Sequence, residues 1–307
     1  MRDSLNFAAE ECAMQSTTMT TVVLPIALAI IMLGLGMSLT VADFKRVAKV
    51  PKAAFIALAC QILVLPAIAL LLVLMFDLKP ELAVGVMLLA ASPGGTTANI
   101  FSHLAGGDVA LNVSLTAINS VLAVVTLPIV VNLAITGFLD ADTSIGLQAD
   151  KMLQVFAIVL VPVVIGMVVN RRAPSLTARL RKPVKIASIV FLALATGLAI
   201  FQERDNVGGY LKSVGTLTLL LAVLSLTIGY WIPRLARVTR KQAIASSFEI
   251  GIHNSVLAIT IALSPALLNS TEMAIPAAVY GVVMFFPASA LAYWISRRRE
   301  PAEVVAP

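Results

Sequence analysis

The stretch FEIGIHNSVLA, residues 248–258, places a carboxylate, a glycine, a histidine and an asparagine in the middle of a long apolar segment. Glu249 is the only acidic residue that we place inside the hydrocarbon of the membrane, where a charged side chain costs about 3 kcal/mol or more to insert. A second unusual stretch, ASPGGTTANIFS (residues 91–102), carries Pro-Gly-Gly near the middle of another apolar segment. Lipid cannot satisfy freed backbone groups, so we expect unwound backbone at such depth only where protein or a cavity surrounds it.

The composition indicates a membrane protein. Of the 307 residues, 59% are hydrophobic and 12% are charged, whereas about a quarter of the residues in soluble domains are charged. Apolar runs of the roughly 20 residues needed to span a bilayer recur along the chain. We therefore predict an all-α polytopic membrane protein with nine transmembrane helices, at residues 20–40, 53–76, 81–105, 108–136, 149–170, 184–202, 210–233, 242–264 and 274–296.

The basic residues lie mostly on one side of these predicted spans. Most of the 22 Lys and Arg residues fall in four segments, namely 45–52, 171–185, 234–241 and 297–299. This bias is typical of cytoplasmic loops, so we expect the N-terminus outside and the C-terminus in the cytoplasm of a cell membrane, such as a bacterial inner membrane. The net charge of +6 then reflects orientation, and no nucleic-acid partner is expected.

The two unusual spans occupy related positions. Each is followed by one further span, and the two run in opposite directions through the membrane. This is typical of an inverted repeat, here with four spans (20–136) and five spans (149–296), whose two discontinuous helices cross at the midplane. Half-helix N-termini after each break suit an anion, and unwound carbonyl groups suit a cation.

Several polar residues inside the spans have more than one interpretation. Glu249 is either a neutralised buried carboxyl group or an ion-binding or proton-carrying residue, and the broken helix beside it favours the second. His253 is either a hydrogen-bonded packing residue or a proton-titrating partner of Glu249. Gln61 is the sole amide inside the second span. Four further residues are each explained by helix–helix hydrogen bonds when taken singly, although Asn112 and Thr116 share a helical face: Asn99, Asn112, Thr116 and Asn119.

Three stretches resemble the bile acid:sodium symporter family. The fourth and fifth helices of that family are similar to SPGGTTANIFSHLAGGDVALNVSLT (92–116), its ninth helix to FEIGIHNSVLA, and its second helix with the following basic loop to GMSLTVADFKRV (36–47). The resemblance implies a nine-helix form that lacks the first helix of ten-helix bacterial members. It also implies an extracytoplasmic tail (1–19), a panel domain (20–52 and 149–207), a core domain (53–148 and 208–296) and a cytoplasmic tail (297–307).

The resemblance implies two sodium sites that share Glu249. The first would use Asn99, Thr116 and Glu249 together with residues 98 and 112. Family members often have serine at both of those positions, whereas this chain has Ala98 and Asn112. An alanine offers no oxygen, but an asparagine still does.

The second sodium site would use Gln61, Glu249, the carbonyl groups of Ile250 and Ile252, and His253. The glutamine that is commoner at position 253 offers an oxygen, whereas histidine offers only nitrogens, which are poor ligands for a hard cation. Two further residues match positions implied in substrate contact, Thr96 and Asn254.

These observations predict a secondary active transporter rather than an enzyme. The expected function is sodium-coupled symport of an organic anion, either a bile-acid-like steroid anion or a small carboxylate, by alternating access. The coupling ion is Na+, no organic cofactor is expected, and membrane lipid is the other partner. The alternative is a proton-coupled organic anion transporter that uses Glu249 and His253. An intramembrane aspartyl protease would need two aspartates inside the hydrocarbon, and the two within the predicted spans, Asp108 and Asp150, lie at span ends.

Overall fold

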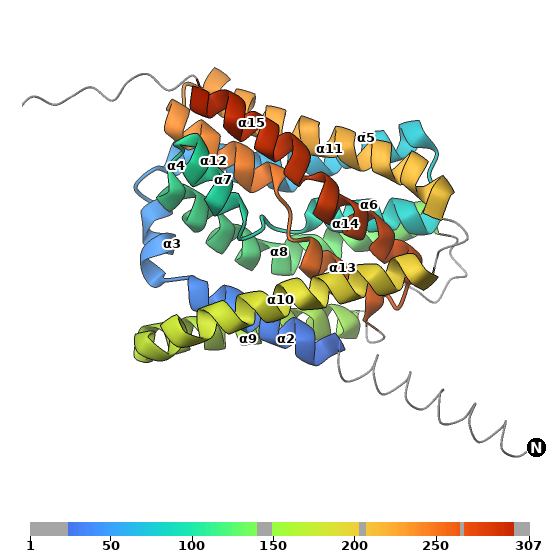
Figure 1. Ribbon diagram of the computed structural model, residues 1–307, viewed down its shortest axis with the longest axis horizontal. Coiled ribbons are helices and arrows are strands. Elements are labelled where there is room, and N and C mark those ends of the chain that lie inside the picture. Colours follow the sequence, from blue (N-terminus) through green and yellow to red (C-terminus); the bar gives the residue numbers. More distant parts are fainter. Residues whose placement is uncertain (1–23, 140–148, 203–206, 265–266, 298–307) are drawn as a thin grey trace, which may run out of the picture.

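The computed structural model describes residues 24–139, 149–202, 207–264 and 267–297 (Figure 1). Helices make up nearly all of this part of the chain, and no strand longer than an isolated bridge occurs within it. The two predicted tails, 1–19 and 297–307, lie outside the described residues apart from Arg297.

Four described stretches are long and apolar enough to cross a membrane: 51–76, 109–138, 214–235 and 271–297. In order, they contain α4 (Pro51–Ala59), the π-helical turn η2 (Cys60–Val64) and α5 (Leu65–Phe76); α8 (Val109–Phe138); most of α11 (Val207–Leu235); and α14 (Thr271–Val283) with α15 (Phe285–Arg297). The predicted class, an all-α membrane protein, is confirmed.

The remaining helices include those of the two spans that we expected to be interrupted, α6 (Pro80–Ala91) with α7 (Ala98–Ala105) and α12 (Arg240–Gly251) with α13 (Ser255–Leu263). The others are α2 (Leu24–Ser38), α3 (Val41–Val47), α9 (Ala149–Arg172) and α10 (Pro174–Gln202). Both interruptions are present, between α6 and α7 and between α12 and α13. Helix α10 starts well before the predicted residue 184 because Pro174 suits a first helical position, and the basic residues that follow continue the helix.

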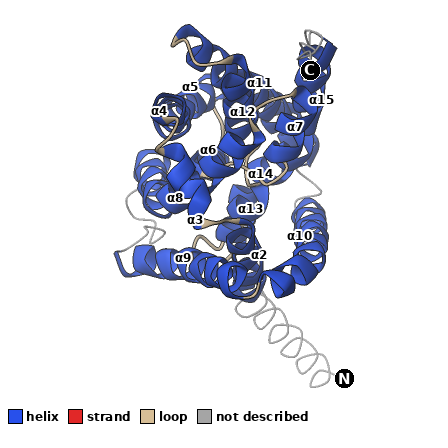
Figure 2. Ribbon diagram, turned by 90° about the vertical axis from the view of Figure 1, so that its left-hand side faces the viewer, coloured by secondary structure: helices blue, strands red, loops and turns tan. Residues whose placement is uncertain are grey.

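The helices form two layers joined by a pair of helices between them (Figure 2). Helices α2, α9 and α10 lie together on one side, whereas α4, α5, α6, α7, α8, α11, α12 and α15 lie on the other. Helices α13 and α14 lie between, where α10 packs against both and α2 packs against α13. In the smaller layer the backbones of α2 and α9 approach closely at Gly36. A Cβ on this glycine would lie 2.1 Å from the carbonyl oxygen of Val163, so only a residue without a side chain fits there. Small residues permit such backbone contact between membrane helices.

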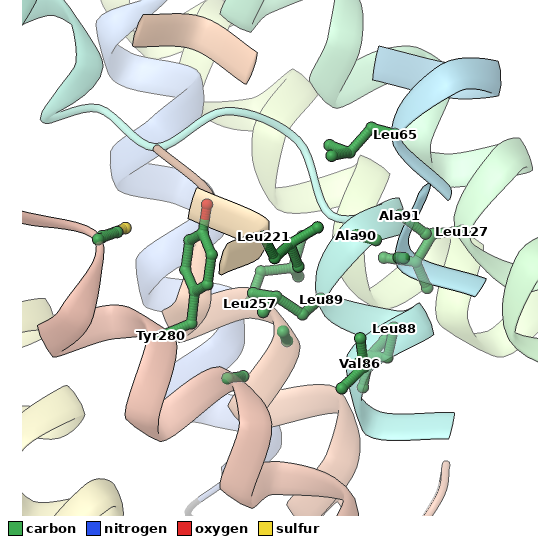
Figure 3. Packing of buried hydrophobic residues seen from close by; sticks show 14 of the residues in the cluster. Leu65, Val86, Leu88, Leu89, Ala90, Ala91, Leu127, Leu221, Leu257 and Tyr280 are labelled. Atoms are coloured by element: carbon green, nitrogen blue, oxygen red, sulfur yellow. The ribbon is translucent and has the colours of Figure 1, made fainter. Parts of the chain in front are cut away.

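Helix α6 lies at the centre of the larger layer. Every residue from Leu82 to Ala91 is buried, as expected of a helix that is apolar around its whole circumference. Figure 3 shows its residues Leu88 and Leu89 among side chains from α5, α8, α11, α13 and α14. This packing fixes the end of α6, where the first interruption begins.

Candidate functional site

The two interruptions lie against each other. After α6 the chain is extended, and the N–H of Gly95 donates to the carbonyl oxygen of Ile252 at 2.6 Å. The N–H of Asn254 donates to the carbonyl oxygen of Pro93 at 2.9 Å. The backbone groups freed by one break are therefore satisfied by the other, which meets the requirement for unwound backbone inside a membrane protein.

Gly94 brings the first interruption onto the carboxyl group of Glu249. It forms an isolated antiparallel bridge with His253, and a Cβ on Gly94 would lie 2.2 Å from Glu249 Oε1. Only glycine fits this contact. The side chain of Glu249 is 2% exposed, so the polypeptide itself forms part of the enclosure around the acid.

Helix α8 supplies the polar partners of Glu249. The hydroxyl group of Thr116 donates to Oε2 at 2.5 Å. The carboxyl group also faces the side chain of Asn119 and the N–H of Gly94. Its other oxygen, Oε1, has no hydrogen-bond partner in the described part of the chain. One oxygen of this buried acid is therefore free for a ligand.

Buried acceptor oxygens without a partner occur on several of the side chains predicted to bind sodium. Within the described residues they belong to four of the side chains predicted to bind sodium: Gln61, Asn99, Asn112 and Glu249. The amide of Gln61 donates to the carbonyl oxygen of Ser92 at 3.1 Å, and that of Asn112 to the carbonyl oxygen of Ala245 at 2.7 Å. Buried polar atoms are nearly always paired. Free oxygens whose amide N–H groups are already used match a hard cation, which prefers oxygen ligands.

A π-helical turn positions Gln61. The N–H of Leu65 donates to the carbonyl oxygen of Cys60, five residues earlier, which defines the wide turn η2. Pro66 follows directly and has no N–H to continue the regular pattern. Such turns occur frequently at functional sites. Here the turn leaves Gln61 buried at 4% exposure, in contact with the end of α6.

His253 lies at the second interruption and does not bond to Glu249. Its Nδ1 lies 3.3 Å from the carbonyl oxygen of Ser92, and its ring packs edge-on at 5.2 Å against Tyr280. Because a carbonyl group only accepts, Nδ1 carries the proton and Nε2 is bare, and Nε2 has no partner among the described residues. The end of α12 at Gly251 removes the helical spacing that would bring His253 onto Glu249.

The backbone carbonyl groups at the end of α12 are partly engaged. Tyr280 donates its hydroxyl hydrogen to the oxygen of Gly251 at 3.0 Å. The oxygen of Ile252 accepts from Gly95. Ile250 lies in the last turn of α12, where carbonyl groups lack partners within the helix. Of the two predicted carbonyl ligands, the Ile252 oxygen therefore already has a donor.

The two residues predicted to contact substrate flank the interruptions. Thr96 is exposed and Asn254 is half-buried. Asn254 caps α13, because its Oδ1 accepts from the N–H of Leu257 at 3.1 Å. Thr97 at the start of α7 makes no such side-chain cap, so the first N–H groups of α7 lack a capping side chain. Near them, the amide of Asn99 makes a long contact of 3.4 Å with the carbonyl oxygen of Thr96.

The comparison with protein families agrees with this arrangement. The family model described as the sodium bile acid symporter family matches residues 25–209. The chain belongs to this family. Members of this family are sodium-coupled membrane transporters and not enzymes, which confirms the resemblance and the expectation of sodium-coupled transport.

Related proteins of the sodium bile acid symporter family come from plants, bacteria and animals. The probable sodium/metabolite cotransporter BASS1 of Arabidopsis thaliana chloroplasts is 29% identical over 91% of this chain and 68% of its own length. The uncharacterized sodium-dependent transporter YocS of Bacillus subtilis is 28% identical over 88% of this chain and 82% of its own. The human ileal sodium/bile acid cotransporter is 28% identical over 78% of this chain and 68% of its own.

Two residues at the site of this symporter were not identified from the sequence. Asn119 was interpreted as a helix–helix contact, yet its side chain faces Glu249. Its spacing of three residues from Thr116 and seven from Asn112 places all three on one helical face, and this was the available signal. No sequence pattern could have identified Tyr280, because nothing in α14 distinguishes it from a packing tyrosine.

Proposed function

We propose that this protein carries out sodium-coupled symport of an organic anion, either a bile-acid-like steroid anion or a small carboxylate. The observation that carries the proposal is the free Oε1 of the buried Glu249, together with the unpaired buried oxygens of Gln61, Asn99 and Asn112. A buried acid without a cationic side chain beside it is costly when charged. A bound sodium ion would supply the missing positive charge.

The first proposed sodium site consists of Asn99, Asn112, Thr116 and Glu249. The free Oδ1 atoms of Asn99 and Asn112 support it, as does the hydrogen bond between Thr116 and Glu249. Ala98 is fully buried and contributes no oxygen, so Asn112 takes a larger share of the coordination in this chain.

The second proposed sodium site consists of Gln61, Glu249, Ile250, Ile252 and His253. The free Oε1 of Gln61 supports it. Two features make it the weaker site: the engaged carbonyl oxygen of Ile252 and the nitrogen that His253 offers in place of an oxygen.

The proposed substrate position lies at the starts of α7 and α13, beside Thr96 and Asn254. The N-terminus of a helix favours an anion through its free N–H groups and its dipole. The two starts face the region where the interruptions cross, so a carboxylate or sulfonate there would lie close to the sodium sites. Each net positive charge that moves inward gains roughly 2.3 kcal/mol per 100 mV of membrane potential.

Transport by alternating access would use the two layers of the fold. We assign α2, α9 and α10 to the panel domain and the other layer, with α13 and α14, to the core domain, within a nine-helix inverted repeat. Rocking of one unit against the other about a fixed site is the usual motion of such folds. We further propose that the N-terminus is extracytoplasmic and the C-terminus cytoplasmic, in a cell membrane such as the bacterial inner membrane.

Uptake by proteoliposomes tests the coupling directly. Labelled taurocholate, pyruvate and pantoate would be offered under an inward sodium gradient, an inward proton gradient at equal sodium, and neither gradient. We expect uptake of at least one anion to require the sodium gradient. Uptake that ignores sodium and follows the proton gradient would support the alternative in which Glu249 and His253 carry protons, for which the bare Nε2 of His253 is the favourable observation.

A further inference from the structure

Ser102 on α7 is a buried serine whose hydroxyl group is unused. The residue is 0% exposed, and its Oγ has no hydrogen-bond partner in the described part of the chain. A serine inside a helix either points to solvent or bonds back to the carbonyl group one turn earlier. Three buried serines on α8 and α11 bond back in this way, at 2.5–2.8 Å: Ser114, Ser120 and Ser225. The hydroxyl group of Ser102 is therefore free for another partner.

The hydroxyl group of Ser102 lies in the contact between α7, the turn that follows α7, and α12. A Cβ on Gly107 would lie 2.6 Å from Ser102 Oγ and 3.2 Å from the backbone nitrogen of Ala245. Asn112 reaches the same residue of α12 from α8, because its amide donates to the carbonyl oxygen of Ala245 at 2.7 Å. Ser102 and Asn112 therefore approach Ala245 from two different helices, and each keeps an unpaired oxygen.

Two residues one turn earlier on α7 extend this set. Ala98 and Asn99 precede Ser102 by four and three residues, so they share its face of the helix. Ala98 is fully buried and has no oxygen to offer, whereas Asn99 keeps an unpaired Oδ1. From Asn99 toward the turn between α7 and α8, Ser102 is the next residue of that face with a side-chain oxygen.

A path of oxygens connects this region to the buried acid. Thr116 Oγ1 lies 3.1 Å from the carbonyl oxygen of Asn112 and 2.5 Å from Glu249 Oε2. Ala245 lies four residues before Glu249 on α12, and Asn112 lies four residues before Thr116 on α8. Ala245 and Asn112 therefore form a layer one helical turn away from the layer of Glu249 and Thr116. Ser102 lies in this second layer, which we call the outer oxygen layer (Ser102, Asn112 and Ala245).

We propose that Ser102 is a further sodium ligand, which forms with Asn99 and Asn112 a position for the ion one turn away from Glu249. This inference rests on the proposed function. The three side-chain ligands of this ion position are neutral oxygens, of the kind that hard cations accept. Without a carboxylate the position holds the ion more weakly than Glu249 does. Weak and successive sites let an ion enter and leave, so this position is suited to an ion moving between Glu249 and the turn that follows α7.

Sodium-dependent thermal stabilisation of the purified protein tests the proposal without knowledge of the substrate. Melting temperature would be recorded against sodium chloride, with choline chloride keeping the ionic strength constant. We expect Ser102→Ala to need about three- to tenfold more sodium for half of the maximal stabilisation, as for loss of one neutral contact. Ser102→Cys should behave alike, because it keeps the volume and replaces oxygen with a soft sulfur. The matched control is Ser114→Ala, a buried serine of α8 whose hydroxyl bonds within its own helix, and its sodium curve should equal that of the unaltered protein.

The possible outcomes separate this inference from the proposed function. If Ser102→Ala and Ser102→Cys keep the unaltered sodium curve while Glu249→Gln loses stabilisation, Ser102 binds water only and the inference is wrong. If Glu249→Gln itself keeps full sodium stabilisation, the proposed sodium site is wrong, and the inference fails with it. An equal loss of sodium affinity in Ser114→Ala would also contradict the inference about Ser102. The effect would then be a general result of removing a buried hydroxyl group.

Discussion

Gly94 and Glu249 are in direct contact, although 155 positions separate them in the chain: the space that a Cβ of residue 94 would fill is occupied by the carboxyl group of residue 249, 2.2 Å from that Cβ. The contact joins the two interrupted helices at the acid on which the proposed ion coupling depends. It also makes the glycine as specific a part of the site as the acid.

The first prediction concerns Gly94→Ala. The added methyl group must displace the Glu249 carboxyl group, because the other side of Gly94 is held by the bridge to His253. We expect sodium-driven uptake to fall at least about tenfold, the effect of roughly 1.4 kcal/mol on binding. The control is Gly137→Ala in α8, where a Cβ would meet nothing within 4 Å. That variant should transport normally, and a normal Gly94→Ala variant would contradict the proposed role of the contact.

The second prediction concerns Glu249→Gln. Glutamine keeps the shape and can still accept a hydrogen bond from Thr116, but it removes the negative charge that a sodium ion would neutralise. We expect the variant to fold, to melt at the same temperature in sodium and in potassium chloride, and to lose sodium-driven uptake. Glu81→Gln is the control, since Glu81 lies in the first turn of α6, away from the interruptions. Sodium-specific stabilisation that survives in Glu249→Gln would refute the shared-ligand role.

The third prediction concerns His253→Gln. Glutamine would place a carbonyl oxygen where the structure has the bare Nε2 of an imidazole, and a hard cation prefers oxygen. We expect the sodium dependence of uptake to shift to lower concentration or to become steeper. His253→Leu has a similar apolar bulk and no oxygen, and it should produce neither change. A sodium curve that is identical for the unaltered protein and His253→Gln would show that this residue does not limit ion binding.

The central features of the fold could be predicted because they violate the rules for membrane helices. Pro93 with its two following glycines, and Glu249 with Gly251, are costly within an apolar span, so their presence predicted two breaks. The π-helical turn at Gln61 could not be predicted, because Cys60–Val64 is uniformly helix-compatible and the turn depends on backbone geometry. Which amide oxygens stay unpaired also depends on contacts between distant helices, as with Asn112 and Ala245. Periodicity within one segment carries no information about such contacts.

Tyr280 gives a further prediction about what holds the second interruption in place. Its hydroxyl group is the donor to the carbonyl oxygen of Gly251 at 3.0 Å, and its ring supports that of His253. Tyr280→Phe keeps the ring contact but leaves this buried carbonyl group without its donor, which costs about 1–3 kcal/mol.

We therefore expect Tyr280→Phe to lower the melting temperature in the absence of sodium. Sodium should recover part of that loss, because an ion bound at Glu249 favours the same folded arrangement of α12. The measurement is a pair of melting curves, with and without sodium chloride, for this variant and for Tyr293→Phe. Tyr293 is 57% exposed, so its hydroxyl group should be dispensable. Equal melting temperatures for the two variants would mean that the Tyr280 hydrogen bond does not hold the end of α12, and that the backbone pairing with residues 93–95 suffices.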